Sequence, residues 1–301
     1  MTSSHSRIPA SEGHCVPPVR SLLLSVAALL LATATIPAQA QSPQPAGSLA
    51  KPASLHAPSS SAAVLATGGL PCPNVDKVAR LDQPLTRTGR QLAAGAPIKI
   101  VAIGSSSTAG AGASSQGRAY PNRLALELTR RFQSDDVSVV NRGINGEEAN
   151  DMIARFETEV LAEKPDLVLW QVGTNSLLRD RFNSATESVI HAGIRQLKPS
   201  GADIVLMDAQ FAPKVLAKAG ADDMVHRLAA IAKDEHVHIF RRYAMMRQWL
   251  EAEQIGFDTF VSSDGLHMND WSYGCLAKSL GTAIAEAATR PTATAAAKPA
   301  R

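Results

Sequence analysis

Aromatic residues are scarce in this chain of 301 residues, since Phe, Tyr and Trp make up only 4% of it. This scarcity disfavours a large platform of stacked rings for sugar binding, although Trp170, Trp249 and Trp271 are candidates for lining a cleft. A dominant charge is also lacking, because 30 Lys and Arg residues against 27 Asp and Glu residues give a net charge of +3. Without a strong basic cluster behind it, this small excess gives no support for a nucleic-acid partner, and we expect none.

Long hydrophobic runs are lacking outside the N-terminus. The apolar run at residues 21–36 follows Arg20 and precedes Ala38-Gln39-Ala40. It is shorter than the roughly 20 apolar residues that a membrane-spanning helix needs. A basic flank, a short apolar core and an A-x-A ending predict a secretory signal peptide over residues 1–40, cleaved after Ala40. A retained transmembrane anchor is the alternative. We therefore expect a periplasmic or secreted protein without stable membrane insertion after cleavage.

Cysteine is limited to Cys15, Cys72 and Cys275. Cys15 would leave with the signal peptide, and the other two can form a disulfide outside the cytoplasm. The alternative is a pair of buried free cysteines that behave as small hydrophobic residues. The histidines lack zinc-like spacing: His236 and His238 lie two apart on an expected strand, most simply as surface residues. We expect neither a metal nor a cofactor.

Composition divides the chain. Residues 41–69 are rich in Pro, Ala and Ser, and this composition is typical of a disordered linker. Residues 291–301 have an Ala, Thr and Pro composition that predicts a disordered tail. The stretch between them, residues 70–290, has the length of one domain.

Within that domain, apolar runs alternate with amphipathic segments. We expect strands at residues 98–103, 137–140, 166–172, 203–207 and 237–240, and helices at residues 119–132, 147–163, 185–197, 222–234, 242–254 and 270–287. Strands that alternate with helices predict an α/β fold: a three-layer α/β/α sandwich around a flavodoxin-like parallel five-stranded sheet. Ligands of such sheets bind beyond the carboxyl ends of the strands, so the loops after Ile103, Val140 and Val172 are expected on one rim.

Two glycine-containing loops follow the first two strands. Ser105-Ser106-Ser107 lies in the first, where small residues allow a tight turn that exposes a hydroxyl group. A phosphate-binding loop is the alternative, although neither the dinucleotide nor the Walker pattern is present. Gly143 and Gly146 in the second loop allow left-handed backbone or close approach, or an ordinary turn.

The third and fourth segments add polar groups. Asn175, at the end of a buried strand, can donate a hydrogen bond into a site on the rim, or can make an Asx-turn. Asp264 and His267 lie three apart in a tight turn, where the carboxylate can hold one imidazole nitrogen and leave the other free for a serine proton. Their alternative roles are a turn cap and a structural histidine.

In order and content, the four segments resemble the conserved blocks of the SGNH, or GDSL-like, hydrolases. The matching residues, within about 98–287, are Gly104-Ser105-Ser106, Gly146, Gly173-Thr174-Asn175 and Asp264-Gly265-Leu266-His267. The resemblance implies Ser106 as nucleophile, His267 as base and Asp264 as its partner. It also implies an oxyanion hole formed by the N–H groups of Ser106 and Gly146 and the side chain of Asn175.

One residue departs from the family pattern, because Ser105 stands where the family usually has Asp. With three serines in succession, Ser105 and Ser107 are fallback candidates for the nucleophile, and Gly143 is the fallback for Gly146.

The resemblance implies an exported serine esterase that hydrolyses short-chain acyl esters or carbohydrate O-acetyl esters through an acyl-enzyme on Ser106. The alternatives are a lipolytic esterase or lysophospholipase, an O-acyltransferase with the same triad, and a non-enzymatic exported ligand-binding domain. The expected partner is a small-molecule or carbohydrate ester. The oligomeric state is not predicted.

Overall fold

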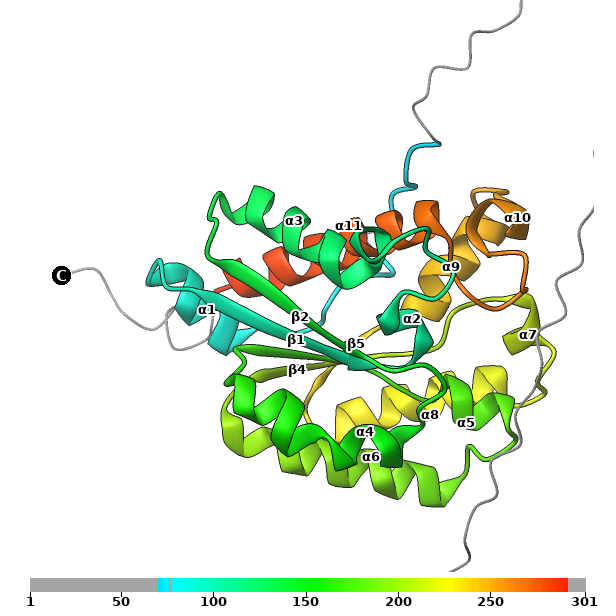
Figure 1. Ribbon diagram of the computed structural model, residues 1–301, viewed down its shortest axis with the longest axis horizontal. Helices are drawn as coiled ribbons and strands as arrows, with labels where there is room; N and C mark the ends of the chain where they lie inside the picture. Colours follow the sequence, from blue (N-terminus) through cyan, green and yellow to red (C-terminus); the bar gives the residue numbers. More distant parts are fainter. Residues whose placement is uncertain (1–69, 76, 292–301) are drawn as a thin grey trace, which may run out of the picture. The chain divides into compact units, whose positions relative to one another are not determined.

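The computed structural model describes residues 70–75 and 77–291, and its five strands form one parallel sheet (Figure 1). The strands are β1 Ile98–Gly104, β2 Val137–Gly143, β3 Leu167–Gln171, β4 Asp203–Met207 and β5 His238–Phe240. Their order across the sheet, β2-β1-β3-β4-β5, is that of flavodoxin-like folds. The predicted fold class is confirmed. The predicted signal peptide (residues 1–40), the predicted linker (residues 41–69) and residues 292–301 of the predicted tail lie outside the described residues.

Helices cover both faces of the sheet, with α3 and α11 side by side above it in Figure 1 and α4, α6 and α8 below it. The main helices are α1 Thr86–Ala93, α3 Tyr120–Phe132, α4 Ala149–Ala154, α6 Ser184–Leu197, α8 Ala221–Asp234, α9 Arg242–Glu251 and α11 Asp270–Thr289. Short turns of helix are α2 Ser106–Ala109, α5 Thr174–Leu178, α7 Pro213–Leu216, α10 Phe257–Phe260 and the 3-10 turns η1 Gln116–Arg118, η3 Leu161–Glu163 and η4 Lys198–Ser200.

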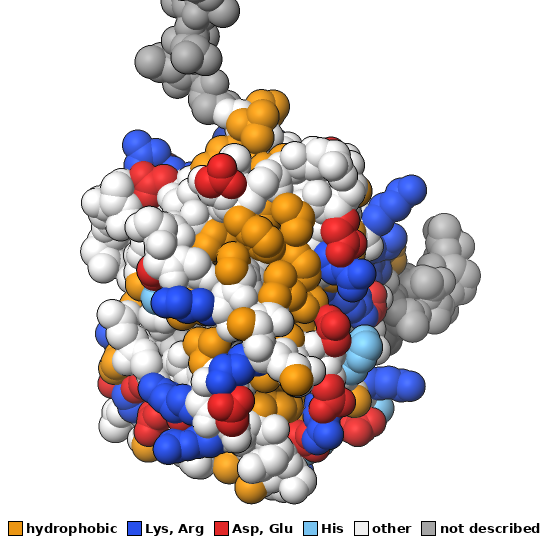
Figure 2. All heavy atoms as spheres, turned by 90° about the vertical axis from the view of Figure 1, so that its right-hand side faces the viewer, with side chains coloured by type: hydrophobic (Ala, Val, Ile, Leu, Met, Phe, Trp, Pro, Cys, Tyr) orange, Lys and Arg blue, Asp and Glu red, His pale blue; other side chains and the backbone are white. Residues whose placement is uncertain are grey.

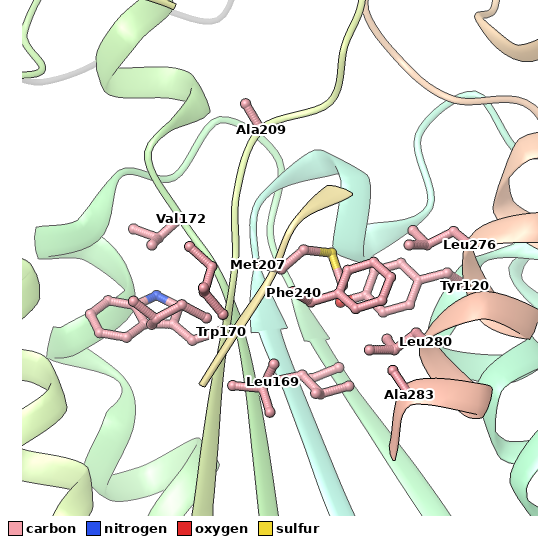
Figure 3. Close-up of a cluster of buried hydrophobic side chains, with 14 of the residues drawn as sticks. Tyr120, Leu169, Trp170, Val172, Met207, Ala209, Phe240, Leu276, Leu280 and Ala283 are labelled. Carbon is pink, nitrogen blue, oxygen red and sulfur yellow. The ribbon is translucent and has the colours of Figure 1, made fainter. Parts of the chain in front are cut away.

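The core lies on both sides of the sheet, which is why the strands read as nearly continuous apolar runs. Figure 3 shows Trp170 on one side and Tyr120, Phe240 and Leu280 on the other. The Trp170 ring packs edge-on against Phe156, with centroids 5.0 Å apart.

The expectation that the tryptophans line a cleft is wrong for two of them, because Trp170 and Trp249 are fully buried in the core. Trp271 is half-buried, and its Nε1 donates a hydrogen bond to the carbonyl oxygen of Leu70 (2.5 Å). The expectation for the histidines is also partly wrong. Only His238 lies on β5, where burial lowers its pKa, whereas His236 occupies the turn before the strand with a positive φ.

The predicted helix at residues 147–163 is not continuous. A capping box between Glu148 and Asp151 starts α4 at Ala149. The chain then passes through a π-helical turn, η2 Phe156–Val160, before η3. Arg155, at the junction, directs its guanidinium to groups outside the helix, as described below. The amphipathic pattern therefore predicts correctly which residues are buried, but the prediction of one regular helix over this range is wrong.

The carboxyl ends of β1, β2 and β3 lie at one edge of the sheet, as predicted. Gly104 and Gly143 are register partners at the ends of β1 and β2. Gly143 allows close packing, because a Cβ atom there would overlap the backbone of α2 at Thr108 and Ala109. The α2 turn is thereby held tightly against the end of the sheet.

A disulfide joins Cys72 to Cys275, with their Cα atoms 5.3 Å apart. It links the segment before α1 to α11. In this structure the two cysteines are therefore paired and are not free buried thiols.

Candidate active site

Of the three consecutive serines, only Ser106 has an accessible side chain. Ser105 is 3% exposed, and its N–H and hydroxyl group both donate to Oε1 of Gln171, at 2.9 and 3.1 Å. Ser107 is buried and is hydrogen-bonded to Tyr273. Ser106 begins α2 directly after β1 and is only partly buried. The fallback candidates Ser105 and Ser107 therefore lack access to a substrate.

The fold brings Ser106 together with His267 and Asp264. The Ser106 hydroxyl lies 2.8 Å from Nε2 of His267. Nδ1 of His267 lies 2.5 Å from Oδ2 of Asp264. A carboxylate can only accept, so Nδ1 carries the proton and donates, which leaves Nε2 to accept from the serine hydroxyl. This is the tautomer that a general base needs.

A tight turn fixes the Asp264 carboxylate. Its Oδ1 accepts hydrogen bonds from the N–H groups of Leu266 (2.8 Å) and His267 (2.9 Å) and from the Ser262 hydroxyl (2.7 Å). Partial burial acts to raise the pKa of Asp264, but the hydrogen bonds from His267, Leu266 and Ser262 outweigh it and hold the pKa well below its usual range. The carboxylate therefore stays ionised and able to orient the imidazole.

Gly146 and Asn175 lie beside each other on the rim. Nδ2 of Asn175 donates to the carbonyl oxygen of Glu147 (2.8 Å), which uses one of the two amide hydrogens. Gly146 adopts a positive φ of 82°, which favours glycine. Within residues 70–75 and 77–291, the N–H groups of Ser106 and Gly146 donate to no protein acceptor. These donors have the chemistry of an oxyanion hole.

Gly143, the fallback for Gly146, has a different role. Its N–H donates to Oδ1 of Asn141 (2.9 Å), and its Cα faces the backbone of α2. That N–H group is already bonded, so Gly143 serves packing.

Two further residues support the loops. Arg155 holds the loop after β2, since its Nη2 donates to the carbonyl oxygen of Arg142 (2.9 Å) and to the carboxylate of Glu147 (2.6 Å). Gln171 holds the loop after β1 through Ser105. Sequence reasoning missed both. A polar Gln171 in a buried apolar strand was an available signal, whereas Arg155 offered none.

The rim faces the viewer in Figure 2, where hydrophobic side chains gather in the middle of the face with Lys, Arg, Asp and Glu around them. Among large hydrophobic residues, Ile144 after β2 and Leu216 in α7 are exposed. Apolar surface is therefore available on the same face as the triad.

The described residues hold no group of three or more His, Cys, Asp or Glu side chains that could bind a metal ion. The same part of the chain contains no helix with the length and hydropathy to cross a bilayer.

Two curated relatives are esterases. A 115-residue segment, 38% of this chain, is 31% identical to an arylesterase from Vibrio mimicus and covers 56% of that protein. A segment of 81 residues, 24% of this chain, is 31% identical to an acetylxylan esterase from Geobacillus stearothermophilus and covers 37% of it. The chain thus matches well under two thirds of the length of either relative.

Solved structures share the fold. A catalytic mutant of an acetylxylan esterase from Geobacillus stearothermophilus superposes with a TM-score of 0.54 at 21% identity, over 62% of this chain and 94% of that one. A two-domain esterase active on acetylated mannans gives a TM-score of 0.60 at 21% identity, over 73% of this chain and 57% of that one. Residues 71–290 match the non-GDSL lipase-like family. The match covers most of the chain, so the resemblance to SGNH hydrolases is confirmed and the chain belongs to the non-GDSL lipase-like family.

Proposed function

We propose that the protein is a serine esterase that hydrolyses carboxylic esters through an acyl-enzyme on Ser106. The observation that carries the proposal is the continuous series of hydrogen bonds from the partly buried, accessible Ser106 hydroxyl through His267 to Asp264. Because this series places a nucleophile, a base and an orienting carboxylate within hydrogen-bond distance, it meets the geometric requirement for covalent catalysis.

The reaction starts with attack of the Ser106 oxygen on the ester carbonyl carbon, while Nε2 of His267 takes the serine proton. The carbonyl π electrons move to its oxygen, and this oxyanion accepts hydrogen bonds from the N–H groups of Ser106 and Gly146 and from Asn175. When the tetrahedral intermediate collapses, the C–O bond to the alcohol breaks and His267 returns the proton to the leaving alkoxide. Water then repeats the sequence on the acyl-serine and releases the acid.

Short acyl esters, including O-acetyl groups on carbohydrates, are the proposed substrates. In support, the printed names of relatives include an acetylxylan esterase and an esterase active on acetylated mannans. With Trp170 and Trp249 buried, hydrogen bonds rather than broad ring stacking would hold a sugar. The apolar centre of the rim favours a second candidate, a lipolytic esterase that accepts longer acyl chains.

The proposed location is the periplasm or the exterior. The signal-peptide pattern at residues 1–40 supports it, and so does the disulfide, because such bonds persist in oxidising compartments.

Hydrolysis of p-nitrophenyl acetate and octanoate by the wild type, Ser106→Ala and Ser115→Ala tests the proposal. Ser115 is an exposed serine nearby in the same loop, so it controls for the loss of a hydroxyl group. We expect Ser106→Ala to lower kcat by about 10⁴-fold or more and Ser115→Ala to behave as wild type. Equal activity of Ser106→Ala and the wild type would falsify the proposed nucleophile.

The same assay separates the alternatives. Faster cleavage of octanoate than of acetate favours the lipolytic candidate. Transfer of the acyl group to an added alcohol in preference to water identifies an acyltransferase. A folded wild type that cleaves neither ester and does not react with a fluorophosphonate at Ser106 is a binding protein.

A further inference from the structure

A groove of about 430 Å³ lies between α3 and α11, the two helices that run side by side above the sheet in Figure 1. No residue of the triad or of the proposed oxyanion hole lines it. Small residues on α11 create its width, because Gly274 and Ala277 face α3 where larger side chains would fill the space. A Cβ atom at Gly274 would overlap the guanidinium of Arg123, which lies across that position.

Basic side chains dominate the lining of this groove. Arg118 comes from η1, Arg123 and Arg130 from α3, and Lys278 from α11. The only carboxylate in the lining belongs to Glu127. The sequence shows no basic run, because these four cations lie up to 160 positions apart and the fold brings them together.

The acidic group of the groove is already neutralised from within α3. Oε1 of Glu127 accepts from Arg130 (2.8 Å) and from Arg131 (2.7 Å). Across the described ranges, no salt bridge involves Arg118, Arg123 or Lys278. Three cations therefore face the groove without a salt bridge to an acidic side chain.

The position of Arg123 makes this lack of a partner costly. Its side chain is partly buried, and burial together with the charge of Arg118 lowers its pKa. Asp270 opposes that shift through its charge, although its carboxylate is hydrogen-bonded to the N–H group (2.8 Å) and the hydroxyl group (2.6 Å) of Ser114 and forms no salt bridge with Arg123. A bound anion would accept hydrogen bonds from the Arg123 guanidinium and compensate its charge.

We propose that this groove binds an acidic glycan, a sugar chain that carries carboxylate groups along its length. Arg123 and Arg130 are seven residues apart on α3, or about 10 Å along the helix axis, so the charges are distributed along the groove and not focused on one ion. The lining contains no aromatic side chain on which nucleobases could stack. The identification of a glycan rests on the proposed function, whereas the anion site itself does not.

The groove is linked to the proposed active site by the chain itself. The loop that leaves Ser106 continues to Ser114, whose bonds to Asp270 join it to the start of α11. It then enters η1, which forms one end of the groove. Asp270 is also close to the triad in the sequence, because His267 lies three residues before it, in the turn that precedes α11. A glycan held in the groove would therefore extend toward Ser106 and present its acetyl groups there.

Binding of unacetylated oligogalacturonate to the full chain carrying Ser106→Ala tests the proposal without any turnover. Calorimetry at low ionic strength compares Arg118→Gln/Lys278→Gln with the control Arg90→Gln/Lys233→Gln. All four residues are exposed, and both double variants lose two positive charges. We expect the groove variant to bind about tenfold more weakly, equivalent to about 1.4 kcal/mol, and the control to stay within about twofold of its parent.

Neutral xylohexaose and vesicles containing an anionic phospholipid complete the experiment. We expect neither to bind in a manner that depends on Arg118 and Lys278. Equal weakening in the two double variants, equally tight binding of xylohexaose, or groove-dependent binding of vesicles alone overturns the proposal. The affinity of a second variant, Arg123→Gln, for oligogalacturonate is compared with that of its parent. Its melting temperature is checked first, since Arg123 packs against α11.

These outcomes are independent of esterase activity. If p-nitrophenyl acetate is not cleaved but oligogalacturonate binds through the groove, the anion site stands and the esterase proposal fails. If the ester is cleaved and the groove variant binds oligogalacturonate as tightly as its parent, the esterase proposal stands and the anion site fails.

Discussion

Ser105 occupies the position where the SGNH pattern usually has aspartate, and its surroundings explain why a serine suits this chain. Its N–H and hydroxyl group both donate to the same oxygen of the buried Gln171, and Thr108 donates to that oxygen as well (3.3 Å). A residue that donates is needed there, because the facing group is an acceptor. The loop that carries Ser106 is thus held by donors converging on one amide oxygen.

Replacing Ser105 by Asp should therefore destabilise the protein. The carboxylate would be buried against the Gln171 oxygen without a donor, which costs about 1–3 kcal/mol or more. Ser105→Ala, which loses one hydrogen bond without adding a charge, should cost about 1 kcal/mol. Urea unfolding measures both variants. A Ser105→Asp protein as stable as the wild type would mean that Gln171 does not act as the acceptor.

At this scale, motif order in the sequence identified Ser106, Asp264 and His267, and the structure places the three side chains in hydrogen-bond contact. Motif order could not distinguish Ser106 from its neighbours, because exposure depends on how α2 packs on the sheet. Gln171 and Arg155 act through contacts with residues distant in sequence, and local patterns do not encode such contacts.

At the scale of elements, a cluster of charges joins α6 to the end of α8. Glu235 accepts from Lys198 (2.5 Å), His191 (2.9 Å) and Arg195 (3.0 Å), and its own side chain is buried. The hydrogen bond from Lys198 lowers the pKa of Glu235 to about 2, against the opposing effect of burial. The two helices thus share one ionised carboxylate.

This lowered pKa predicts how stability depends on pH. Between about pH 4.5 and pH 2, the unfolded chain binds a proton at Glu235 that the native protein does not, so the contribution is present above pH 4.5 and is lost as the pH falls through 2. Glu235→Gln should therefore lower the unfolding free energy by up to about 3 kcal/mol at neutral pH and by little near pH 2. Urea unfolding across this range measures the difference.

Glu286→Gln is the matched control, because Glu286 is exposed on α11 and its carboxylate forms no salt bridge within the described ranges. A pH-independent difference between Glu235→Gln and the wild type would contradict the proposed linkage.

Element prediction succeeded where burial alone dictates structure. The strand expected at residues 203–207 is β4 with the same bounds, since an apolar run covered on both faces has few alternatives. The single helix expected at residues 147–163 is interrupted after Ala154, where the chain passes into the π-helical turn η2. The apolar pattern indicates which residues are buried but does not encode this change of helix type. The short helices α2 and α5 were missed, because four or five residues carry too little periodicity.

At the scale of the whole molecule, the disulfide connects residues 203 positions apart. Closing such a long loop restricts the unfolded chain, and loss of a native disulfide typically costs about 2–5 kcal/mol. We expect Cys72→Ala/Cys275→Ala to melt at a lower temperature and to retain its triad, which the disulfide does not touch.

A thiol assay provides the control. The denatured, unreduced chain without residues 1–40 should contain no reactive thiol, and two should appear after reduction. Reductant should lower the melting temperature of the wild type and leave that of the double variant unchanged. Two reactive thiols before reduction would show that the cysteines are unpaired.

The separation of the triad along the chain also sets an order in time. Ser106 precedes its base by 161 residues, and His267 lies in the turn just before α11. During synthesis the nucleophile emerges from the ribosome long before the imidazole that would deprotonate it. Under the proposed mechanism, a nascent chain or any fragment that ends before Asp264 has no esterase activity. The enzyme becomes active only when the turn that carries Asp264 and His267 has been synthesised and has folded against the loop that carries Ser106.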